Sequence, residues 1–338
     1  MSRVVVAMSG GVDSSVAALL LKEQGHEVIG MTMRLWPESR CCSSEGIRDA
    51  VQVARNIGIK HAFLSLSRIF NEKVIKYFLE EYRRGRTPNP CVVCNREIKF
   101  RILLEKAKSL GAKFVATGHY ARIEKKKGRC LLKKGIDSDK DQSYFLYDLS
   151  QSQMNSVIFP IGGYTKARVR EIAGKKGLPV AEKPSSQDIC FAEDRRISER
   201  SAGFKPGPII DLSGREIGQH KGLVHYTIGQ RRGIGISSKE PLYVVAIDAS
   251  RNAVIVGHDK MLYADCLKAR RVRYIIPQTA AFDAGVKIRY RAPAAGAWII
   301  PEGRNAAVKF QKPQRAVTPG QSAVFYDGEY VIGGGIIE

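Results

Sequence analysis

No run of about eighteen apolar residues occurs in this sequence, and its N-terminus leads into a strand-like segment without the hydrophobic region of a signal peptide. These absences argue against a transmembrane helix and a secretory leader, so we expect a cytoplasmic protein without a membrane partner. Acidic residues are also scarce, because 33 Asp and Glu stand against 55 Lys and Arg. The formal net charge of +22 points to RNA or DNA as a partner, and a merely soluble basic protein is the alternative.

Two familiar nucleotide-binding motifs are missing: Gly-x-x-x-x-Gly-Lys-Ser/Thr of the P-loop and Gly-x-Gly-x-x-Gly of dinucleotide sites. Residues 7–15 instead read Ala-Met-Ser-Gly-Gly-Val-Asp-Ser-Ser, between a β-branched run at 3–8 and a helical pattern. Gly10 and Gly11 can adopt positive φ and let a phosphate approach the backbone, where the N-terminus of the helix also points. Asp13 is the carboxylate placed to reach a phosphate-bound Mg²⁺. The hydroxyl donors of this turn are Ser9, Ser14 and Ser15. A ligand-free turn capped by Asp13 is the alternative.

Short apolar segments alternate with amphipathic helical patterns over roughly the first third of the chain, which predicts an α/β fold with a doubly wound parallel sheet. Ligands bind at the carboxyl ends of the strands in such sheets, where Met33 is expected. Residues 121–134 are predicted to form a basic hairpin, and alternating segments beyond Cys266 predict a small antiparallel barrel. We therefore expect a catalytic domain at 1–200, a small central β-rich domain at 201–264 and a C-terminal β-barrel domain at 265–338.

The seven cysteines are an odd number spread along the chain, which does not fit a secreted disulfide framework. Cys91 and Cys94 follow Arg-Arg-Gly-Arg-Thr-Pro-Asn-Pro at 83–90, whose prolines are predicted to exclude helix and to present both thiols on an arch among arginines. Neighbouring cations would lower the pKa of these thiols, although two buried small residues are the alternative. Cys190 lies in a polar, turn-like segment. The other cysteines are Cys130 and Cys266, expected to pack in strands, and the pair Cys41 and Cys42, whose role stays open.

The motif Ser-Gly-Gly-Val-Asp-Ser-Ser resembles the PP-loop of the ATP pyrophosphatases, which cut ATP between its α and β phosphates and leave AMP on an acceptor oxygen. The whole chain resembles the MnmA (TrmU) family of tRNA-specific 2-thiouridylases. The motifs that carry this resemblance, beside the PP-loop, are Arg-Thr-Pro-Asn-Pro, Cys-Asn-Arg-Glu-Ile-Lys-Phe, Thr-Gly-His-Tyr, Lys-Asp-Gln-Ser-Tyr-Phe-Leu, Ser-Gln-Asp-Ile-Cys-Phe, Thr-Ile-Gly-Gln-Arg-Arg-Gly and Thr-Pro-Gly-Gln-Ser-Ala-Val-Phe-Tyr. They run nearly from end to end.

The resemblance implies an adenine nucleotide alpha-hydrolase-like fold and a transferase that uses ATP with Mg²⁺. The family adenylates the C2 oxygen of wobble uridine 34 in tRNA and then transfers sulfur, which gives 2-thiouridine, AMP and pyrophosphate. The implied partners are Lys, Glu and Gln tRNAs and a sulfur donor, namely a cysteine desulfurase, a sulfur-relay protein or free sulfide. The residues suit this chemistry, because a carbonyl oxygen leaves only after activation and a stacked base must be flipped out to react.

The resemblance also implies roles for individual residues. The implied ATP contacts are Ala7, Met8, Ser9, Gly10, Gly11, Val12, Asp13, Ser14, Met33 and Gly118. The implied tRNA contacts are Asn89, Pro90 and Cys91 at the target base, and His119, Lys140, Asp141, Gln142, Arg289, Tyr290 and Gln321 elsewhere. The catalytic residues would be Cys94, Cys190 and Asp13.

One departure leaves the sulfur carrier open. Many relatives have Asp where this chain has Cys91, and in them the residues that match Cys94 and Cys190 are a nucleophile and a persulfide carrier that can also form a disulfide. Here the three thiolates of Cys91, Cys94 and Cys190 could instead hold three irons of a [4Fe-4S] cluster, whose fourth iron carries hydrosulfide. Structural zinc is disfavoured because a closed site wants four ligands and no fourth is evident.

Two other functions fit part of the sequence. Another PP-loop adenylating enzyme, such as an amidotransferase-type synthetase, would need neither Cys94 nor Cys190. A non-catalytic RNA-binding protein with a vestigial nucleotide fold would release no AMP when tRNA and ATP are added.

Overall fold

The computed structural model describes residues 1–36, 43–184, 189–191 and 204–338, and the chain divides into two compact units. The first unit comprises Met1–Val74, Cys91–Asp194 and Glu329–Val331, and the second comprises Ile75–Pro90, Arg195–Gly328 and Ile332–Glu338. The pair Cys41 and Cys42 and the expected boundary between residues 200 and 201 lie outside the described residues. Within the described ranges, no helix is both long enough and apolar enough to cross a membrane.

The first unit is built on a five-stranded sheet in the order β3-β2-β1-β4-β7, in which every pairing is parallel. Its strands are β1 (Arg3–Ala7), β2 (Glu27–Arg34), β3 (Lys60–Ser65), β4 (Phe114–Ala116) and β7 (Val157–Ile158). The chain adds strands on one side of β1 and then continues with β4 on its other side. This arrangement confirms the expected doubly wound sheet, and its switch point, where such sheets bind ligands, lies between β1 and β4.

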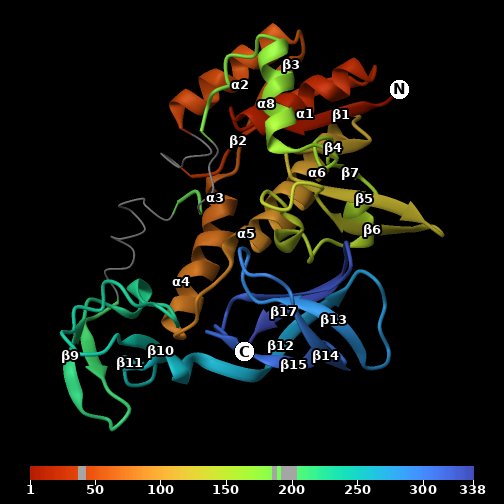
Figure 1. Cartoon of the computed structure of the whole chain (residues 1–338). Coiled ribbons are helices and arrows are strands. Elements are labelled where there is room, and N and C mark those ends of the chain that lie inside the picture. The colour runs from red at the N-terminus through yellow and green to blue at the C-terminus, as the bar shows by residue number, and fades with distance from the viewer. Residues whose placement is uncertain (37–42, 185–188, 192–203) are drawn as a thin grey trace. The chain divides into compact units, whose positions relative to one another are not determined.

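Both faces of this sheet are covered by helices (Figure 1). Val4 and Val6 of β1 share one core with three helices, and Val5, which points to the opposite face, is also fully buried. The three helices are α1 (Val12–Glu23), α2 (Ser44–Asn56) and α8 (Lys166–Lys175). Because neither face meets solvent, β1 is a continuous apolar run rather than an alternating one.

Several shorter elements complete the helical part of the chain. They are α3 (Ser67–Phe70), η1 (Asn71–Ile75), α4 (Lys76–Arg83), α5 (Pro90–Val93), η2 (Cys94–Ile102), α6 (Leu103–Ser109), η3 (Ser143–Phe145), α7 (Gln151–Met154), η5 (Leu223–His225) and η6 (Asp259–Leu262), of which η1 and η2 are π-helical. A π-helix is rare and occurs often at functional sites.

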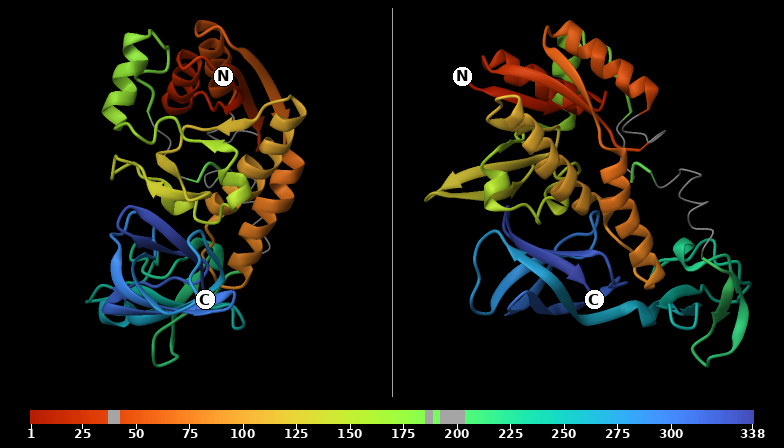
Figure 2. Two further views of the ribbon diagram at one scale, coloured as in Figure 1. Left: turned by 90° about the vertical axis from the view of Figure 1, so that its right-hand side faces the viewer. Right: turned by 180° about the vertical axis from the view of Figure 1, so that it is seen from behind.

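The expected basic hairpin is confirmed as β5 (Ala121–Lys126) and β6 (Arg129–Lys134). The hairpin projects from the first unit (Figure 2). Lys125, Lys126 and Lys127, next to its turn, are exposed.

The second unit contains a small sheet and a barrel. The small sheet has the order β10-β11-β8-β9 and consists of β8 (Gly207–Ile210), β9 (Glu216–His220), β10 (Tyr243–Asp248) and β11 (Ala253–Gly257). The barrel consists of β12 (Tyr263–Tyr274), β13 (Phe282–Lys287), β14 (Ala295–Glu302), β15 (Asn305–Arg315), β16 (Ser322–Asp327) and β17 (Tyr330–Ile337). Its order is β12-β15-β14-β13-β16-β17, and antiparallel pairing of β12 with β17 closes it, so the expected antiparallel barrel is confirmed.

Candidate functional site

The glycine turn follows β1 directly and opens α1. Gly10 has φ +76°, whereas Gly11, the residue before the helix, is extended with φ −94° and ψ 158°. Only Gly10 therefore uses the positive φ that the sequence allowed for both. A Cβ at Gly10 would lie 2.1 Å from the carbonyl oxygen of Gly46 in α2, so the backbones of the turn and of α2 touch. This contact fixes the turn with the N-terminal amides of α1 beside it.

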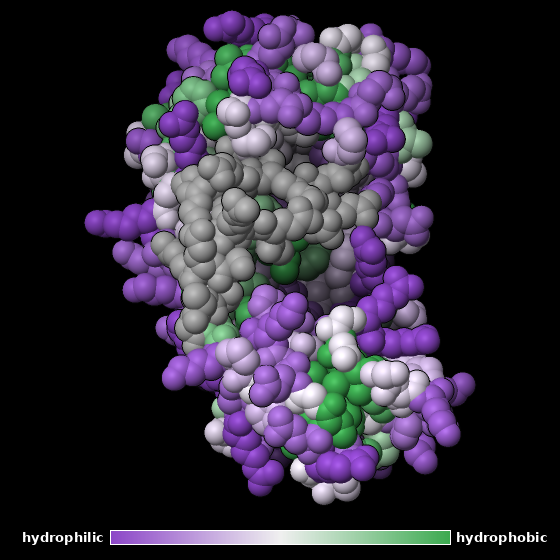
Figure 3. Space-filling model, turned by 90° about the vertical axis from the view of Figure 1, so that its left-hand side faces the viewer, coloured by the Kyte–Doolittle hydropathy of each residue, from purple (hydrophilic) through white to green (hydrophobic). Residues whose placement is uncertain are grey.

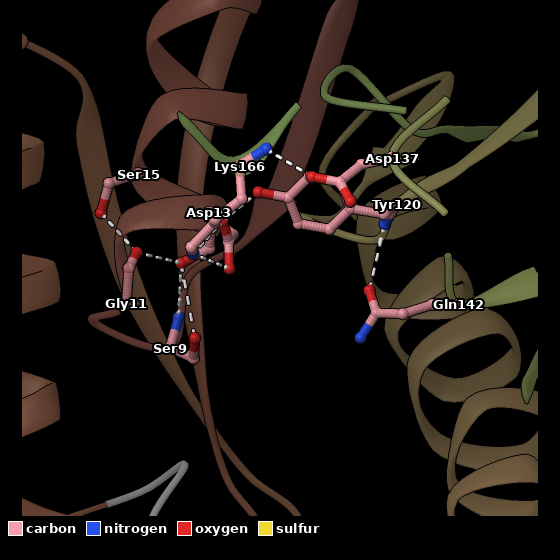
Figure 4. Close-up of polar contacts among 9 residues, drawn as sticks. Ser9, Gly11, Asp13, Ser15, Tyr120, Asp137, Gln142 and Lys166 are labelled. Atoms are coloured by element: carbon pink, nitrogen blue, oxygen red, sulfur yellow. Dashed lines mark hydrogen bonds and ion pairs between the residues drawn. The ribbon is translucent and has the colours of Figure 1, made fainter. Parts of the chain in front are cut away.

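The serine hydroxyls of the turn mostly bond to the turn itself. The Ser14 hydroxyl accepts the Ser9 backbone N–H at 3.2 Å and donates to the Gly11 carbonyl at 3.1 Å. The Ser15 hydroxyl donates to the same carbonyl at 2.9 Å, and Ser15 is fully buried. Ser15 was expected to donate to a ligand, but its position makes it a brace of the turn (Figure 4).

Asp13 is the centre of a polar network that the sequence did not reveal. Lys166 Nζ lies 2.7 Å from Asp13 Oδ1 and 2.8 Å from Oδ2, and the Tyr120 hydroxyl donates to Oδ1 at 2.7 Å (Figure 4). The backbone N–H of Tyr120 donates to the Gln142 side chain at 3.0 Å. Burial, with the adjacent Asp13 carboxylate, raises the pKa of Tyr120, so the phenol remains a donor.

The other residues implied at ATP gather at the carboxyl end of the sheet. A Cβ at Gly118 would lie 2.7 Å from both the Asp13 carbonyl carbon and the Ser14 nitrogen, so only glycine lets the segment after β4 touch the start of α1. Ala7 pairs with Met31 of β2, and Met33 lies two residues further along that strand. The structure therefore brings residues 7–14, Met33 and Gly118 to one edge.

The expected arch that presents Cys91 and Cys94 is wrong. Pro90 begins α5 and Cys94 begins η2, so Cys91 and Cys94 are both helical. Proline lacks only an N–H that the first turn of a helix leaves unpaired anyway, and it is therefore compatible with a helix start.

The electrostatic setting of Cys91 also differs from the expectation. Burial raises the pKa of the Cys91 thiol, and the charge of Lys99 opposes this rise only in part. Two of the arginines expected beside the cysteines, Arg84 and Arg86, instead form ion pairs with Glu81 in the second unit.

Cys190 is partly exposed, and the ring of its neighbour Phe191 packs edge-on against Phe70 at 5.8 Å. Residues 186–188 of the Ser-Gln-Asp-Ile-Cys-Phe motif lie outside the described residues. None of the cysteines in the described ranges is joined in a disulfide. No three His, Cys, Asp or Glu side chains within those ranges come together as a metal-ligand set, so Cys91, Cys94 and Cys190 as placed do not fit a [4Fe-4S] cluster.

The remaining cysteines divide between core and surface. Cys130 packs in the interior as expected, with its thiol 3.3 Å from the Asn155 side-chain oxygen. Cys266 is exposed, contrary to expectation, because Leu267 of the same strand faces the barrel core.

In the first unit, the residues implied at tRNA are more buried than the sequence suggested. Asp141 accepts the backbone N–H of Gly135 at 3.0 Å and that of Ser143 at 3.1 Å, so it shapes the loop. His119 is 9% exposed and packs against Phe100 and Phe159. Lys140 and Gln142 keep partial exposure.

Among the tRNA-contact candidates of the second unit, Gln321 contacts the segment before Cys91, to which Asn89 belongs. The Gln321 side chain donates to the carbonyls of Thr87 at 3.0 Å and Pro88 at 3.3 Å. The Asn89 amide donates to the Ser322 hydroxyl at 3.4 Å. Arg289 donates to the Arg315 carbonyl at 2.8 Å, and Tyr290 follows it in the chain.

The buried His119 gives the fold a predictable pH dependence. Burial, with the charge of Lys99, holds the pKa of His119 well below its ordinary value, so the folded state keeps it neutral while the unfolded chain protonates it below about pH 6.5. The unfolded state then binds more protons, and the free energy of unfolding falls as the pH drops from 7 to 5. The free energy of unfolding, measured by urea titration at each pH, should change less steeply with pH in His119→Asn than in the wild type, by up to about 1.4 kcal/mol per pH unit. The exposed His225→Asn serves as the control, and equal slopes in all three proteins would refute this.

The fold and this site define a PP-loop protein, an α/β protein with a glycine turn for phosphate after its first strand. The family model described as tRNA methyl transferase HUP domain matches residues 2–194, the tRNA methyl transferase PRC-barrel domain matches 197–258, and the Aminomethyltransferase beta-barrel domain matches 264–337. The chain belongs to the MnmA family of tRNA-specific 2-thiouridylases and is an enzyme of the sulfurtransferase class.

Two relatives illustrate this membership. The tRNA-specific 2-thiouridylase MnmA 2 of Caldanaerobacter subterraneus subsp. tengcongensis is 51% identical over 356 residues, covering 100% of this chain and 98% of its own length. MnmA of Halothermothrix orenii is 52% identical over 355 residues, covering 100% of this chain and 99% of its own length.

Solved structures show a weaker likeness. A 4-thiouridine synthetase bound to RNA and ATP aligns with a TM-score of 0.39 and 22% identity, covering 56% of this chain and 45% of that one. The U34-tRNA thiolase NcsA from Methanococcus maripaludis, with its [4Fe-4S] cluster, aligns with a TM-score of 0.38 and 20% identity, covering 60% of this chain and 65% of that one. The assignment therefore depends on the sequence relatives.

Proposed function

We propose that this enzyme uses Mg²⁺ and ATP to adenylate the C2 oxygen of uridine 34 in tRNA and then replaces that oxygen with sulfur. The observation that carries the proposal is the phosphate turn at the start of α1, where Gly10, Asp13 and Gly118 meet in a chain whose full-length relatives are named 2-thiouridylases. Asp13 is the residue that would hold Mg²⁺. We propose Lys, Glu and Gln tRNAs as its substrates.

The first step forms a bond between the uridine O2 and the α-phosphorus and breaks the bond from that phosphorus to the oxygen that bridges to the β-phosphate. Pyrophosphate leaves, and the weakly reactive carbonyl becomes a good leaving group. The base must be unstacked to reach this site, so we propose that it is flipped out, with Asn89, Pro90 and Cys91 as its contacts.

The second step uses Cys190 and Cys94. The terminal sulfur of a Cys190 persulfide attacks C2, and the C2–O2 bond breaks as AMP departs. The Cys94 thiolate then attacks the Cys190 sulfur, which forms a disulfide between them and leaves the transferred sulfur on C2. With a desulfurase or a relay protein as donor, a thiol reductant supplies the two electrons that reopen the disulfide, and the donor then transfers sulfane sulfur from its own persulfide to Cys190. With free sulfide as donor, hydrosulfide attacks the Cys190 sulfur of the disulfide, which restores the Cys190 persulfide and releases the Cys94 thiolate without a further reductant.

A [4Fe-4S] cluster on Cys91, Cys94 and Cys190 is the competing carrier. The cluster needs all three thiols at one point, whereas the relay needs only Cys94 and Cys190 to meet, and no three-ligand set gathers within the described residues; we therefore propose the relay. Iron and acid-labile sulfide in anaerobically purified protein distinguish the two. Colourless, iron-free and active protein supports the relay, whereas activity that follows near-stoichiometric iron would overturn it.

The test of the proposed function is nucleoside mass spectrometry of unmodified tRNA after incubation with the enzyme, ATP, Mg²⁺ and a sulfide source. We expect 2-thiouridine at position 34 and one AMP for each sulfur transferred. AMP without thiolation, unaffected by thiol-blocking reagents, would indicate another adenylating enzyme. Absence of AMP release would indicate a non-catalytic RNA-binding protein.

Binding of tRNA should depend strongly on salt. Hydrophilic side chains dominate the described surface of one face (Figure 3), and the net charge is +22. If the protein contacts four or more phosphates of the tRNA, its affinity for tRNA should fall about 100-fold or more between 50 and 200 mM monovalent salt. Fluorescence anisotropy with labelled tRNA measures this, and an affinity that does not change with salt would contradict it.

A further inference from the structure

Lys166 is a cation in the polar network around Asp13 to which neither the PP-loop motif nor the chemistry above gives a role. Its ammonium contacts both carboxylate oxygens of Asp13, at 2.7 and 2.8 Å, and its side chain is only 11% exposed. The Tyr120 hydroxyl adds a third hydrogen bond to the same carboxylate. Asp13 is therefore already neutralised by a cation of the chain itself.

This arrangement conflicts with the binding of Mg²⁺ at Asp13. A carboxylate offers about four lone pairs, of which three are in use here, and an ammonium beside both oxygens repels a second cation. Either Asp13 never meets the metal or Lys166 leaves when the nucleotide arrives.

The geometry around Lys166 allows the side chain to move while its backbone stays fixed. The Lys166 backbone N–H donates to Asp137 at 2.8 Å, and the preceding residue, Thr165, caps the same helix by accepting the N–H of Arg168 at 3.2 Å. The flexible four-carbon stem can therefore swing while α8 remains in position. Tyr120, whose backbone is bonded twice to Gln142, would keep Asp13 in place after the ammonium has left.

We propose that Lys166 is an ATP-binding residue that exchanges partners: its ammonium pairs with Asp13 in the nucleotide-free enzyme and moves to the β- and γ-phosphate oxygens when ATP binds. The exchange frees Asp13 for Mg²⁺ and places a positive charge on the group that leaves as pyrophosphate, where negative charge develops. This inference deepens the proposed function and depends on ATP being its substrate.

The experiment compares ATP and AMP binding by calorimetry on the full chain without tRNA. Lys166→Met removes the charge-assisted contact between the ammonium and the β- and γ-phosphates, so we expect it to weaken ATP binding about 10- to 100-fold. AMP lacks these phosphates, and its binding should weaken less than about threefold. Tyr120→Phe is the matched control: it removes one hydrogen bond from Asp13 but no charge, and the preference for ATP over AMP should not change. Equal losses for both nucleotides, or none, would overturn the exchange.

A second comparison covers the case in which Lys166→Met leaves Asp13 unpaired and fails to fold. The double variant Asp13→Asn/Lys166→Met removes both charges together, and inorganic pyrophosphate in EDTA is the probe, so that metal plays no part. We expect the wild type to bind pyrophosphate and the double variant to have lost this binding. A double variant that binds pyrophosphate as well as the wild type would refute the inference. If the wild type itself binds no ATP, the proposed function fails, whereas wild-type ATP binding with unaffected variants refutes only the role of Lys166.

Discussion

Cys94→Ser should lower 2-thiouridine formation by at least about a thousandfold, while the Kd for ATP stays within twofold. The hydroxyl that replaces the thiol is nearly neutral at pH 7 and cannot attack a persulfide sulfur, so transfer stops before the product is released. Cys94 is buried at the start of η2, and serine is slightly smaller, so no steric conflict arises. Quantitative mass spectrometry of single-turnover reactions gives the rate, and calorimetry gives the Kd.

Two further variants make this prediction specific. Cys266→Ser alters an exposed thiol on the outside of the barrel and should leave thiolation within twofold of the wild type. Cys190→Ser should match the loss of Cys94→Ser, and the double variant should be no worse, because residues that act as a unit are not additive. Thiolation that persists in Cys94→Ser would exclude the relay while leaving the ATP site untouched.

The framework of the first unit could be predicted because its signals are local. Val4, Val5 and Val6 form a continuous β-branched run, and such a run has few stable environments other than a strand covered on both faces. The turn that follows needed a glycine for its backbone, and Gly10 provides it. Alternation of strands and helices then restricts the topology to a few choices.

The errors have equally local causes. The prediction that Pro90 excludes helix is wrong because proline is excluded only from a helix interior. Cys266 was assigned to a core because its strand was recognised, but the inward positions of a strand follow a period of two, and Leu267 occupies one of them.

The network at Asp13 could not be predicted, for a different reason. Lys166 lies 153 residues from Asp13 and Tyr120 lies 107 residues from it, and the motif around Asp13 names neither. The reach of a flexible lysine depends on where its helix is fixed, here by Thr165 and Asp137. Contacts of this kind are set by tertiary packing, which a single sequence does not state.

Gly10→Ala should abolish measurable ATP binding and lower the free energy of unfolding by several kcal/mol. A positive φ alone costs an alanine about 1 kcal/mol, and its Cβ would lie 2.1 Å from the Gly46 carbonyl oxygen, so α2 or the phosphate turn has to shift. The neighbouring Gly11 is extended, and a Cβ there would come no closer than 3.7 Å to the Ser9 hydroxyl, so Gly11→Ala should fold with a loss of at most about 1 kcal/mol.

Gly10→Ala and Gly11→Ala, at adjacent positions of one turn, separate two effects of an added Cβ: strain of the backbone and obstruction of an approaching phosphate. If phosphate approaches the amides of this turn closely, Gly11→Ala weakens ATP binding although its urea unfolding is nearly that of the wild type. Gly174→Ala in α8 is the control for the substitution itself: no atom lies within 4 Å of the added Cβ, and alanine in a helix should stabilise it by up to about 1 kcal/mol without effect on ATP. Wild-type ATP affinity in both Gly10→Ala and Gly11→Ala would mean that the nucleotide binds elsewhere. A phosphate bound at the start of α1 would be disturbed by a Cβ added to this turn.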